Sequence, residues 1–218
     1  MVEIFSDPQV TAESPVLVIL PGCGGELKDL VKLFGKAPQA AWYIACDIGD
    51  RGEKSAGNAW KRDMPECVVE LLRKVNAWGR KAIIVGFSRG GHWGIELCTR
   101  HVRLLSGAVL VGAYPETRDA QYQVEEAENL MQVDLPILTV HGLRDACCTL
   151  AYPKWHARQT QAMLSDAPPP HRRETFTSVT VPGVHDGLIW RAFSNLSFNE
   201  FHDPKVDAIW AAMFVVSQ

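Results

Sequence analysis

Short apolar runs alternate along this chain with longer segments in which apolar residues recur at helical spacing. Runs that are apolar at consecutive positions suit strands buried on both faces, and helical connections between such strands make neighbouring strands parallel. The pattern predicts a doubly wound α/β fold, with a mainly parallel sheet of about six strands and helices on both faces. The expected strands are residues 16–20, 42–46, 82–85, 107–111, 137–140 and 175–181, and the expected helices are 27–34, 68–78, 92–101, 152–164 and 204–216.

The composition is that of one globular domain. The chain has 218 residues, of which 47% are hydrophobic and 22% charged, enough to bury one substantial core. No internal repeat, low-complexity tract or long linker interrupts it, so residues 1–218 are predicted to form a single α/β domain. A net charge of -3 without a polybasic run gives no general attraction to nucleic acid, which is therefore not an expected partner.

The chain shows neither a secretory signal pattern nor an apolar run long enough to span a membrane. We therefore expect a soluble, cytoplasmic protein. Its six cysteines lack Cys-x-x-Cys spacing, which predicts reduced thiols rather than a disulfide framework. Cys46 and Cys98 lie in apolar stretches and are expected to be small buried hydrophobic residues. A structural role is also favoured for Cys147 and Cys148, although oxidation there could perturb the neighbouring Asp145.

The segment Gly86-Phe87-Ser88-Arg89-Gly90-Gly91 directly follows an expected strand and opens an expected helix. A Gly-x-Ser-x-Gly pattern also occurs by chance in glycine-rich loops, so the neighbouring elements have to show whether this one is a catalytic motif. A strand, a sharp turn and a helix are the setting of a nucleophile elbow, which makes Ser88 the candidate nucleophile. Such a turn strains the serine backbone and leaves no space for a Cβ at Gly86 or Gly90.

A serine hydroxyl needs a base within hydrogen-bond reach and a third group that holds the base. Asp145 follows the fifth expected strand, and His185 follows the sixth. Serine, then acid, then histidine is the chain order of α/β-hydrolases. The sequence thus predicts a Ser88, Asp145, His185 triad. Asp186 adjoins the histidine and is poorly placed to serve as its acid, and His141 is expected to stabilise a loop by hydrogen bonding.

An oxyanion hole needs backbone N–H groups aimed at the developing negative charge. One is expected from Arg89, the residue after the nucleophile, and one from Cys23, in the glycine-rich loop after the first expected strand. The glycines around Cys23 allow the backbone to approach a ligand closely. Cys23 is a weaker candidate nucleophile than Ser88, because no recognisable motif supplies a histidine for it.

With these motifs, nearly the whole chain resembles the compact α/β-hydrolases of the carboxylesterase, acyl-protein thioesterase and dienelactone-hydrolase group. The elbow is similar to the Gly-Phe-Ser-Gln-Gly-Gly of the thioesterase branch, and the segment from His141 to Asp145 is similar to its His-Gly-x-x-Asp. The resemblance implies a serine hydrolase that cleaves carboxylic esters or thioesters of small molecules through an acyl-enzyme, with no cofactor and no metal; the small size of the substrate is inferred from the short segment 114–134.

The chain departs from that pattern at two positions. Pro-Gly-Cys-Gly stands where the thioesterase branch has His-Gly and an apolar residue, and Arg89 stands in place of glutamine. Dienelactone hydrolases usually carry cysteine at the elbow, so the presence of Ser88 points away from their chemistry.

The substrate pocket is less well specified. Tyr114, Trp155 and Trp190 flank expected strand ends and are either pocket walls or core residues. The polar segments 49–63 and 114–134 could border the cleft, and the second holds the usual lid position, where its modest length predicts a small rim. His92, one turn after the nucleophile, either borders the cleft or packs its helix.

Two other functions compete with hydrolysis. Gly22-x-Gly24 after a strand, with Asp47 after the next, is partly similar to a dinucleotide-binding fingerprint, but Leu27 stands where the third glycine is needed and Pro21 removes an N–H. The alternative is a catalytically inactive α/β-hydrolase-fold protein that only binds a ligand, because a fold does not determine a function. The oligomeric state does not follow from the sequence.

Overall fold

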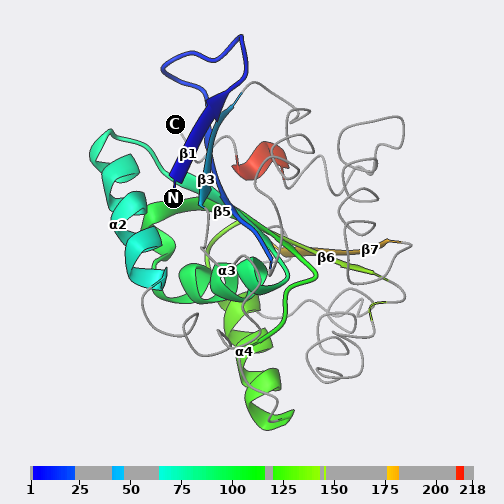
Figure 1. Cartoon of the computed structure of the whole chain (residues 1–218). Coiled ribbons are helices and arrows are strands. Elements are labelled where there is room, and N and C mark those ends of the chain that lie inside the picture. The colour runs from blue at the N-terminus through cyan, green and yellow to red at the C-terminus, as the bar shows by residue number, and fades with distance from the viewer. Residues whose placement is uncertain are drawn as a thin grey trace, which may run out of the picture.

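A seven-stranded sheet is the centre of the described structure (Figure 1). Its strand order is β1-β3-β2-β4-β5-β6-β7; β2 to β7 run parallel, and β1 runs antiparallel to β3 at one edge. The computed structural model describes residues 2–22, 41–46, 64–115, 120–142, 145, 176–181 and 210–213. The strands are β1 (Val2–Ser6), β2 (Val16–Leu20), β3 (Trp42–Cys46), β4 (Ala82–Phe87), β5 (Leu105–Val111), β6 (Ile137–Gly142) and β7 (Phe176–Val181).

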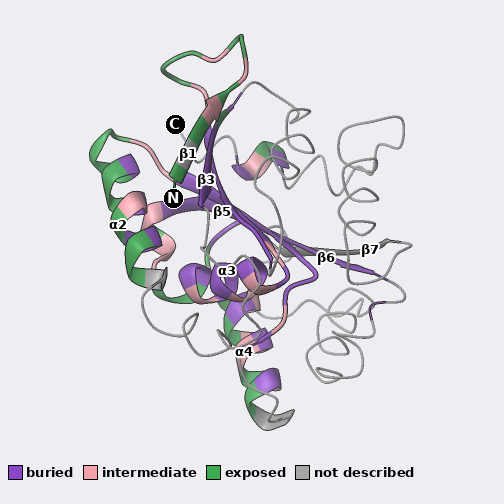
Figure 2. Ribbon diagram, viewed as in Figure 1, coloured by how far each residue is buried: buried purple, intermediate pink, exposed green. Residues whose placement is uncertain are grey.

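The parallel part of the sheet confirms the predicted strands, with ends shifted by no more than two residues. Strand β1 was not predicted. Its Val2 and Ile4 side chains are 52% and 62% exposed, because β1 lies at the sheet edge and is less covered than the central strands (Figure 2). A strand that is only partly buried does not need a continuous apolar run, and that run was the signal used for the other six.

Three α-helices are described, namely α2 (Met64–Ala77), α3 (Arg89–Arg100) and α4 (Ala120–Gln132), together with a 3₁₀ turn, η2 (Val102–Leu104). The first two correspond to the helices expected over 68–78 and 92–101, and each begins a few residues earlier than predicted. Residues 210–213 are helical, within the helix expected over 204–216. The helices expected over 27–34 and 152–164 lie outside the described residues, as does the segment 49–63.

Helix α4 corrects the interpretation of 114–134 as one long polar segment. Its Gln123, Ala127 and Leu130 are buried at helical spacing, so this face packs on the protein. The glutamates between these positions made the segment look like a solvated loop, and the buried face includes a glutamine that a hydrophobic pattern does not reveal. The connection from β5 to α4 is therefore only residues 112–119.

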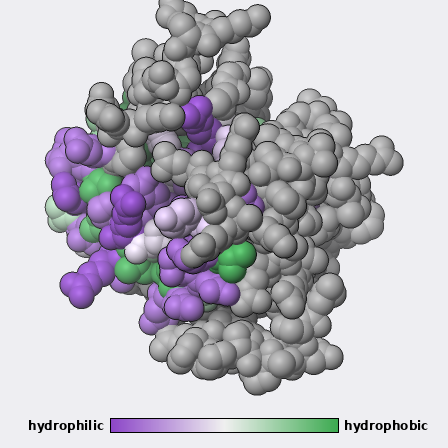
Figure 3. Space-filling view, turned by 90° about the horizontal axis from the view of Figure 1, so that it is seen from below, coloured by the Kyte–Doolittle hydropathy of each residue, from purple (hydrophilic) through white to green (hydrophobic). Residues whose placement is uncertain are grey.

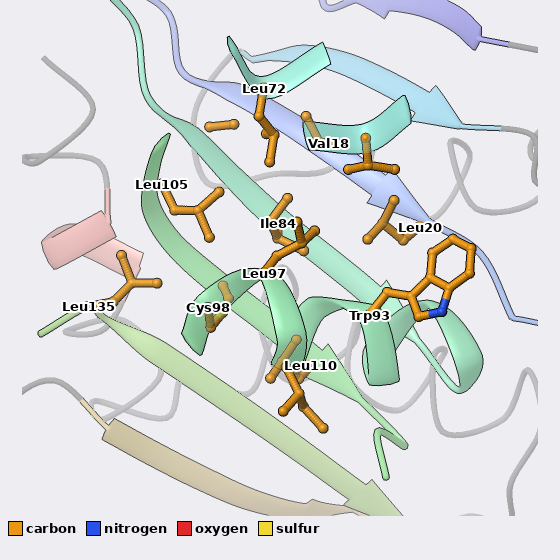
Figure 4. Close-up of a cluster of buried hydrophobic side chains, with 14 of the residues drawn as sticks. Val18, Leu20, Leu72, Ile84, Trp93, Leu97, Cys98, Leu105, Leu110 and Leu135 are labelled. Carbon is orange, nitrogen blue, oxygen red and sulfur yellow. The ribbon is translucent and has the colours of Figure 1, made fainter. Parts of the chain in front are cut away.

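Both faces of the sheet are covered by helices, as predicted. Alternate side chains of β2, β4 and β5 pack with α2 and α3 in one buried cluster, which Figure 4 shows around Ile84, Leu97 and Leu110. Gly107 points to the opposite face, and a Cβ there would overlap the side chain of Met213. Hence the helical turn at 210–213 packs against the other face. Each fully buried aliphatic side chain in such a core contributes about 1.5–3 kcal/mol.

Three cysteines are described, and all are free thiols. Cys46 and Cys98 are buried, as expected, and loss of solvation raises the pKa of the Cys46 thiol to about 12. The same cause raises the pKa of Cys98. These two thiols therefore stay protonated and unreactive near neutral pH, whereas Cys67 is exposed. Among the helices that the structure describes, none has the length and apolar character needed to cross a membrane.

Candidate active site

Ser88 lies at the carboxyl end of β4, in the middle of the sheet, and α3 begins at the next residue. Its backbone has φ 53° and ψ −114°, and in the described part of the chain no other non-glycine residue has a positive φ. Such a conformation costs about 1–3 kcal/mol and is found mostly at functional sites. Ser88 is also largely buried, with 9% exposure. The strained turn predicted from the sequence is therefore present.

The two flanking glycines are required by direct backbone contacts. A Cβ at Gly86 would overlap the carbonyl oxygen of Gly90, and a Cβ at Gly90 would overlap the carbonyl oxygen of Leu20. The steric role expected for both glycines is confirmed. It follows that α3 starts closer to the ends of β2 and β4 than any side chain would allow.

Hydrogen bonds hold the Ser88 backbone on both sides. Its N–H donates to the Val111 carbonyl at the end of β5 (2.8 Å), and its carbonyl accepts from the N–H of His92 (3.0 Å). Serine is a preferred N-cap residue, yet the Ser88 side chain makes no capping hydrogen bond to the amides of α3. The hydroxyl at this helix start therefore does not serve as a cap.

The end of β2 lies directly against the elbow. A Cβ at Gly22 would be 2.9 Å from the Phe87 ring and 3.0 Å from the Ser88 Cβ, so only glycine fits there comfortably. Gly22 immediately precedes Cys23, which lies outside the described residues. Arg89 contributes the first amide of α3, at the positive end of the helix dipole. The loop expected to form an oxyanion hole thus begins beside the candidate nucleophile.

Asp145 follows β6 on the same edge of the sheet. It is fully buried, and its N–H donates to the Gly142 carbonyl (3.1 Å). Ser88 follows the carboxyl end of β4, and Asp145 follows the carboxyl end of β6. Because β4, β5 and β6 are parallel neighbours in that order, the two residues lie at the same ends of strands that are separated by β5 alone. A buried carboxylate is stable only among hydrogen-bond donors or positive charges, as the acid of a triad would be. His141, also buried, lies within β6 rather than in the loop where we expected it.

The general base of the predicted triad, His185, is expected in the loop after β7, the strand next to β6. Strand β7 pairs in parallel with β6 and ends at Val181, shortly before His185 in the sequence. His185 itself lies outside the described residues, and so do Asp186, Trp155 and Trp190. Two positions of the predicted triad, Ser88 and Asp145, are therefore described, and the position of His185 stays a prediction.

Tyr114, an expected substrate contact, is half-buried after β5 and packs partly on the core. Its ring stacks on that of His92 with centroids 6.4 Å apart and planes inclined by 19°. The His92 Nδ1 also lies 3.2 Å from the Tyr114 carbonyl oxygen. The sequence left His92 undecided between the cleft and helix packing; the structure connects it to the β5–α4 loop. The sequence signal for a role of His92 near the site was its position one helical turn after Ser88.

A cleft of about 470 Å³ separates α3 from α4 and starts at His92. Its walls include an ion pair between Arg100 and Glu96, 2.7 Å apart. Figure 3 views the molecule from below, and the described residues on that side are mostly hydrophilic, with separate hydrophobic patches. Within the described ranges, no group of histidine, cysteine and acidic side chains is arranged to hold a metal ion.

No family model matches this chain, and no curated protein matches it in sequence. Solved structures do. It is similar to the carboxylesterase of Bacillus cereus at 16% identity, over 91% of this chain and 95% of that chain, with a TM-score of 0.55. An alpha/beta hydrolase enzyme from a Medee basin deep-sea metagenome library has 12% identity, coverage of 90% and 92%, and a TM-score of 0.58.

A third similar structure is the thioesterase domain from the curacin biosynthetic pathway. It has 12% identity, coverage of 89% of this chain and 94% of that chain, and a TM-score of 0.59. Identities this low report on architecture rather than on activity. Together with the sheet order and the strained serine between strand and helix, they show that the chain has the α/β-hydrolase fold.

Proposed function

We propose that this protein is a serine hydrolase that cleaves small carboxylic esters or thioesters through an acyl-enzyme on Ser88. The observation that carries the proposal is the strained backbone of Ser88, held between β4 and α3 with Gly22 packed over it. Strain of this kind persists only where the surrounding structure enforces it, and it is typical of catalytic groups. The similarity to a carboxylesterase and to a thioesterase domain supports this class of reaction.

In the proposed mechanism, His185 takes the proton from the Ser88 hydroxyl as the oxygen attacks the carbonyl carbon. Asp145 orients the imidazole and stabilises the imidazolium that forms. The N–H groups of Cys23 and Arg89 donate to the oxyanion, and the N-terminal end of α3 adds a favourable dipole. His185 then protonates the departing alcohol or thiol, and water repeats the sequence on the acyl-enzyme to release the acid.

The substrate class follows from the surroundings of Ser88. The loop between β5 and α4 occupies only residues 112–119, which is short for a cap that would enclose a long lipid chain. We therefore infer a small substrate bound in an open cleft, with Tyr114, Trp155 and Trp190 as candidate walls. A panel of esters and thioesters graded by acyl length would define the preference.

The test is labelling of the protein with a fluorophosphonate, which reacts with an activated serine. The wild type is expected to be labelled at Ser88 and to hydrolyse a short p-nitrophenyl ester, and Ser88→Ala and His185→Ala should each lose both reactions by at least about a thousandfold. Ser106→Ala is the matched control, since Ser106 is another buried serine of the same sheet, on β5.

Full labelling and turnover in Ser106→Ala would show that the loss in Ser88→Ala is specific. If the folded wild type resists labelling and hydrolyses no member of the panel, the hydrolase proposal is wrong. The inactive ligand-binding protein would then be the better description, with the same fold and no activated serine.

A further inference from the structure

The contact between His92 and Tyr114 joins the elbow helix to the loop that follows β5. The His92 Nδ1 lies 3.2 Å from the Tyr114 carbonyl oxygen. A carbonyl oxygen only accepts hydrogen bonds, so the Nδ1 atom carries the proton and donates it. This bond fixes one tautomer of the neutral ring and ties a backbone atom of the loop to α3.

The loop is also held by close packing around this bond. A Cβ at Gly91 would lie 2.6 Å from the Ala113 Cβ, so the loop backbone rests directly on the first turn of α3. Gly112, with φ 56°, donates its N–H to the Val140 carbonyl of β6 (2.8 Å). Residues 112–114 are thus held by β6 on one side and α3 on the other, and His92 adds a side-chain hydrogen bond to these contacts.

This loop starts beside the candidate nucleophile. The Val111 carbonyl, immediately before it, accepts from the Ser88 N–H, and the His92 N–H donates to the Ser88 carbonyl. His92 therefore contacts Ser88 through its backbone and the loop through its ring. Loops at the carboxyl ends of neighbouring parallel strands form the walls of the ligand cleft in open α/β sheets.

We propose that His92 is a positioning residue for substrate binding: its Nδ1–H holds the Tyr114 carbonyl, and this keeps the loop after β5 in place as a wall of the ester-binding cleft in front of Ser88. The inference rests on the proposed hydrolase function and adds a residue that the triad does not require. The hydrogen bond, rather than the stacked rings, is the anchor, because centroids 6.4 Å apart are near the outer limit for an aromatic pair.

Substitution of His92 should leave the fold intact. The ring is half-buried, and it borders the cleft between α3 and α4 rather than a closed core. A smaller side chain would extend this existing space and not create a sealed cavity, which is the costly case. The variants can therefore be compared as folded proteins.

Three substitutions separate the hydrogen bond from the ring. His92→Asn places an amide N–H near the position of Nδ1 and removes the ring, His92→Phe keeps an aromatic ring and removes the donor, and His92→Ala removes both. We expect His92→Phe and His92→Ala to raise KM for a p-nitrophenyl ester about fivefold, with kcat within about twofold of the wild type. His92→Asn should restore KM to within about twofold.

The split between KM and kcat distinguishes positioning from general destabilisation. A variant that is only less stable contains less active enzyme, so its apparent kcat falls and its KM stays unchanged. Glu96→Gln is the matched control, because Glu96 lies on α3 beside the cleft between α3 and α4 and pairs with Arg100, away from Ser88 and the loop after β5. It should keep both kinetic constants of the wild type.

An unchanged KM in both His92→Phe and His92→Ala would overturn the inference. So would wild-type kinetics in His92→Phe with a raised KM in His92→Asn, since the ring and not the donor would then be the anchor. A wild type that is not labelled by the fluorophosphonate refutes the proposed function itself. Labelled wild type with unaffected His92 variants refutes only the positioning role.

Discussion

The two sides of α3 contact their neighbours in different ways. Toward the sheet, Gly90, Gly91 and Gly94 bring the helix against backbone and side-chain atoms with no space for a Cβ. Toward α4, the helix presents larger polar side chains such as Glu96 and Arg100, and a cleft of about 470 Å³ separates the two helices. The closest steric contacts of the helix that places Ser88 therefore lie on its sheet side. Changes on the sheet side should be costly, and changes on the cleft side should be tolerated.

The largest effect is expected from Gly90→Ala, on the sheet side. Its methyl group would overlap the Leu20 carbonyl oxygen, and backbone atoms of two elements would have to move apart. We expect a loss of about 3 kcal/mol in the free energy of unfolding, measured by urea denaturation, together with loss of fluorophosphonate labelling.

Gly79→Ala is the matched control for this substitution. Gly79 has φ 75° and no atom within contact distance of an added Cβ, so it isolates backbone strain from steric overlap. Its cost should be about 1 kcal/mol. Equal losses in the two variants would show that the close approach of α3 to β2 is not the source of the effect.

A smaller effect is expected from Ser88→Gly, which should be more stable to unfolding than Ser88→Ala. Glycine adopts a positive φ readily, whereas Ser88→Ala keeps the strain, so the difference between these two variants measures it. Ser88→Gly should unfold with a free energy about 1–2 kcal/mol higher than Ser88→Ala, measured by thermal and urea denaturation. Both should be inactive. A less stable Ser88→Gly would mean that the elbow conformation is not strained in solution.

The smallest effect is expected on the cleft side, from Arg100→Gln. This substitution breaks the ion pair with Glu96, but the Arg100 side chain is 71% exposed, so solvent and salt screen the attraction. The free energy of unfolding should fall by no more than about 0.5 kcal/mol, and less at high salt. A loss comparable to that of Gly90→Ala would show that the two sides of α3 are equally constrained.

The elbow could be predicted because its signal is local. A strand, a serine between glycines and a helix are consecutive in the sequence, and each has a pattern of its own. The same holds for β2, β4, β5 and β6, whose burial on both faces produces apolar runs. Strand β1 escaped prediction because it is a partly exposed edge strand without a continuous apolar run, and helix α4 because a glutamine interrupts the apolar pattern of its buried face.

Contacts between distant segments could not be read in this way. The sequence marked Gly22 as part of a glycine-rich loop, but its packing against Phe87 and Ser88 depends on β2 lying next to β4. The partnership of His92 with Tyr114 likewise depends on where β5 ends relative to α3. Neither contact has a local pattern, because the partners are brought together by strand pairing.

By itself, the sequence determined the six parallel strands, the helices α2 and α3, the strained serine turn and the chain order of Ser88, Asp145 and His185. These depend on short-range backbone preferences and on the periodicity of apolar residues. Only the tertiary structure decided that β2 lies beside β4, that Gly22 packs on Ser88, and that His92 holds the loop after β5. Such pairings depend on the packing of the whole sheet and its helices, so no single segment encodes them.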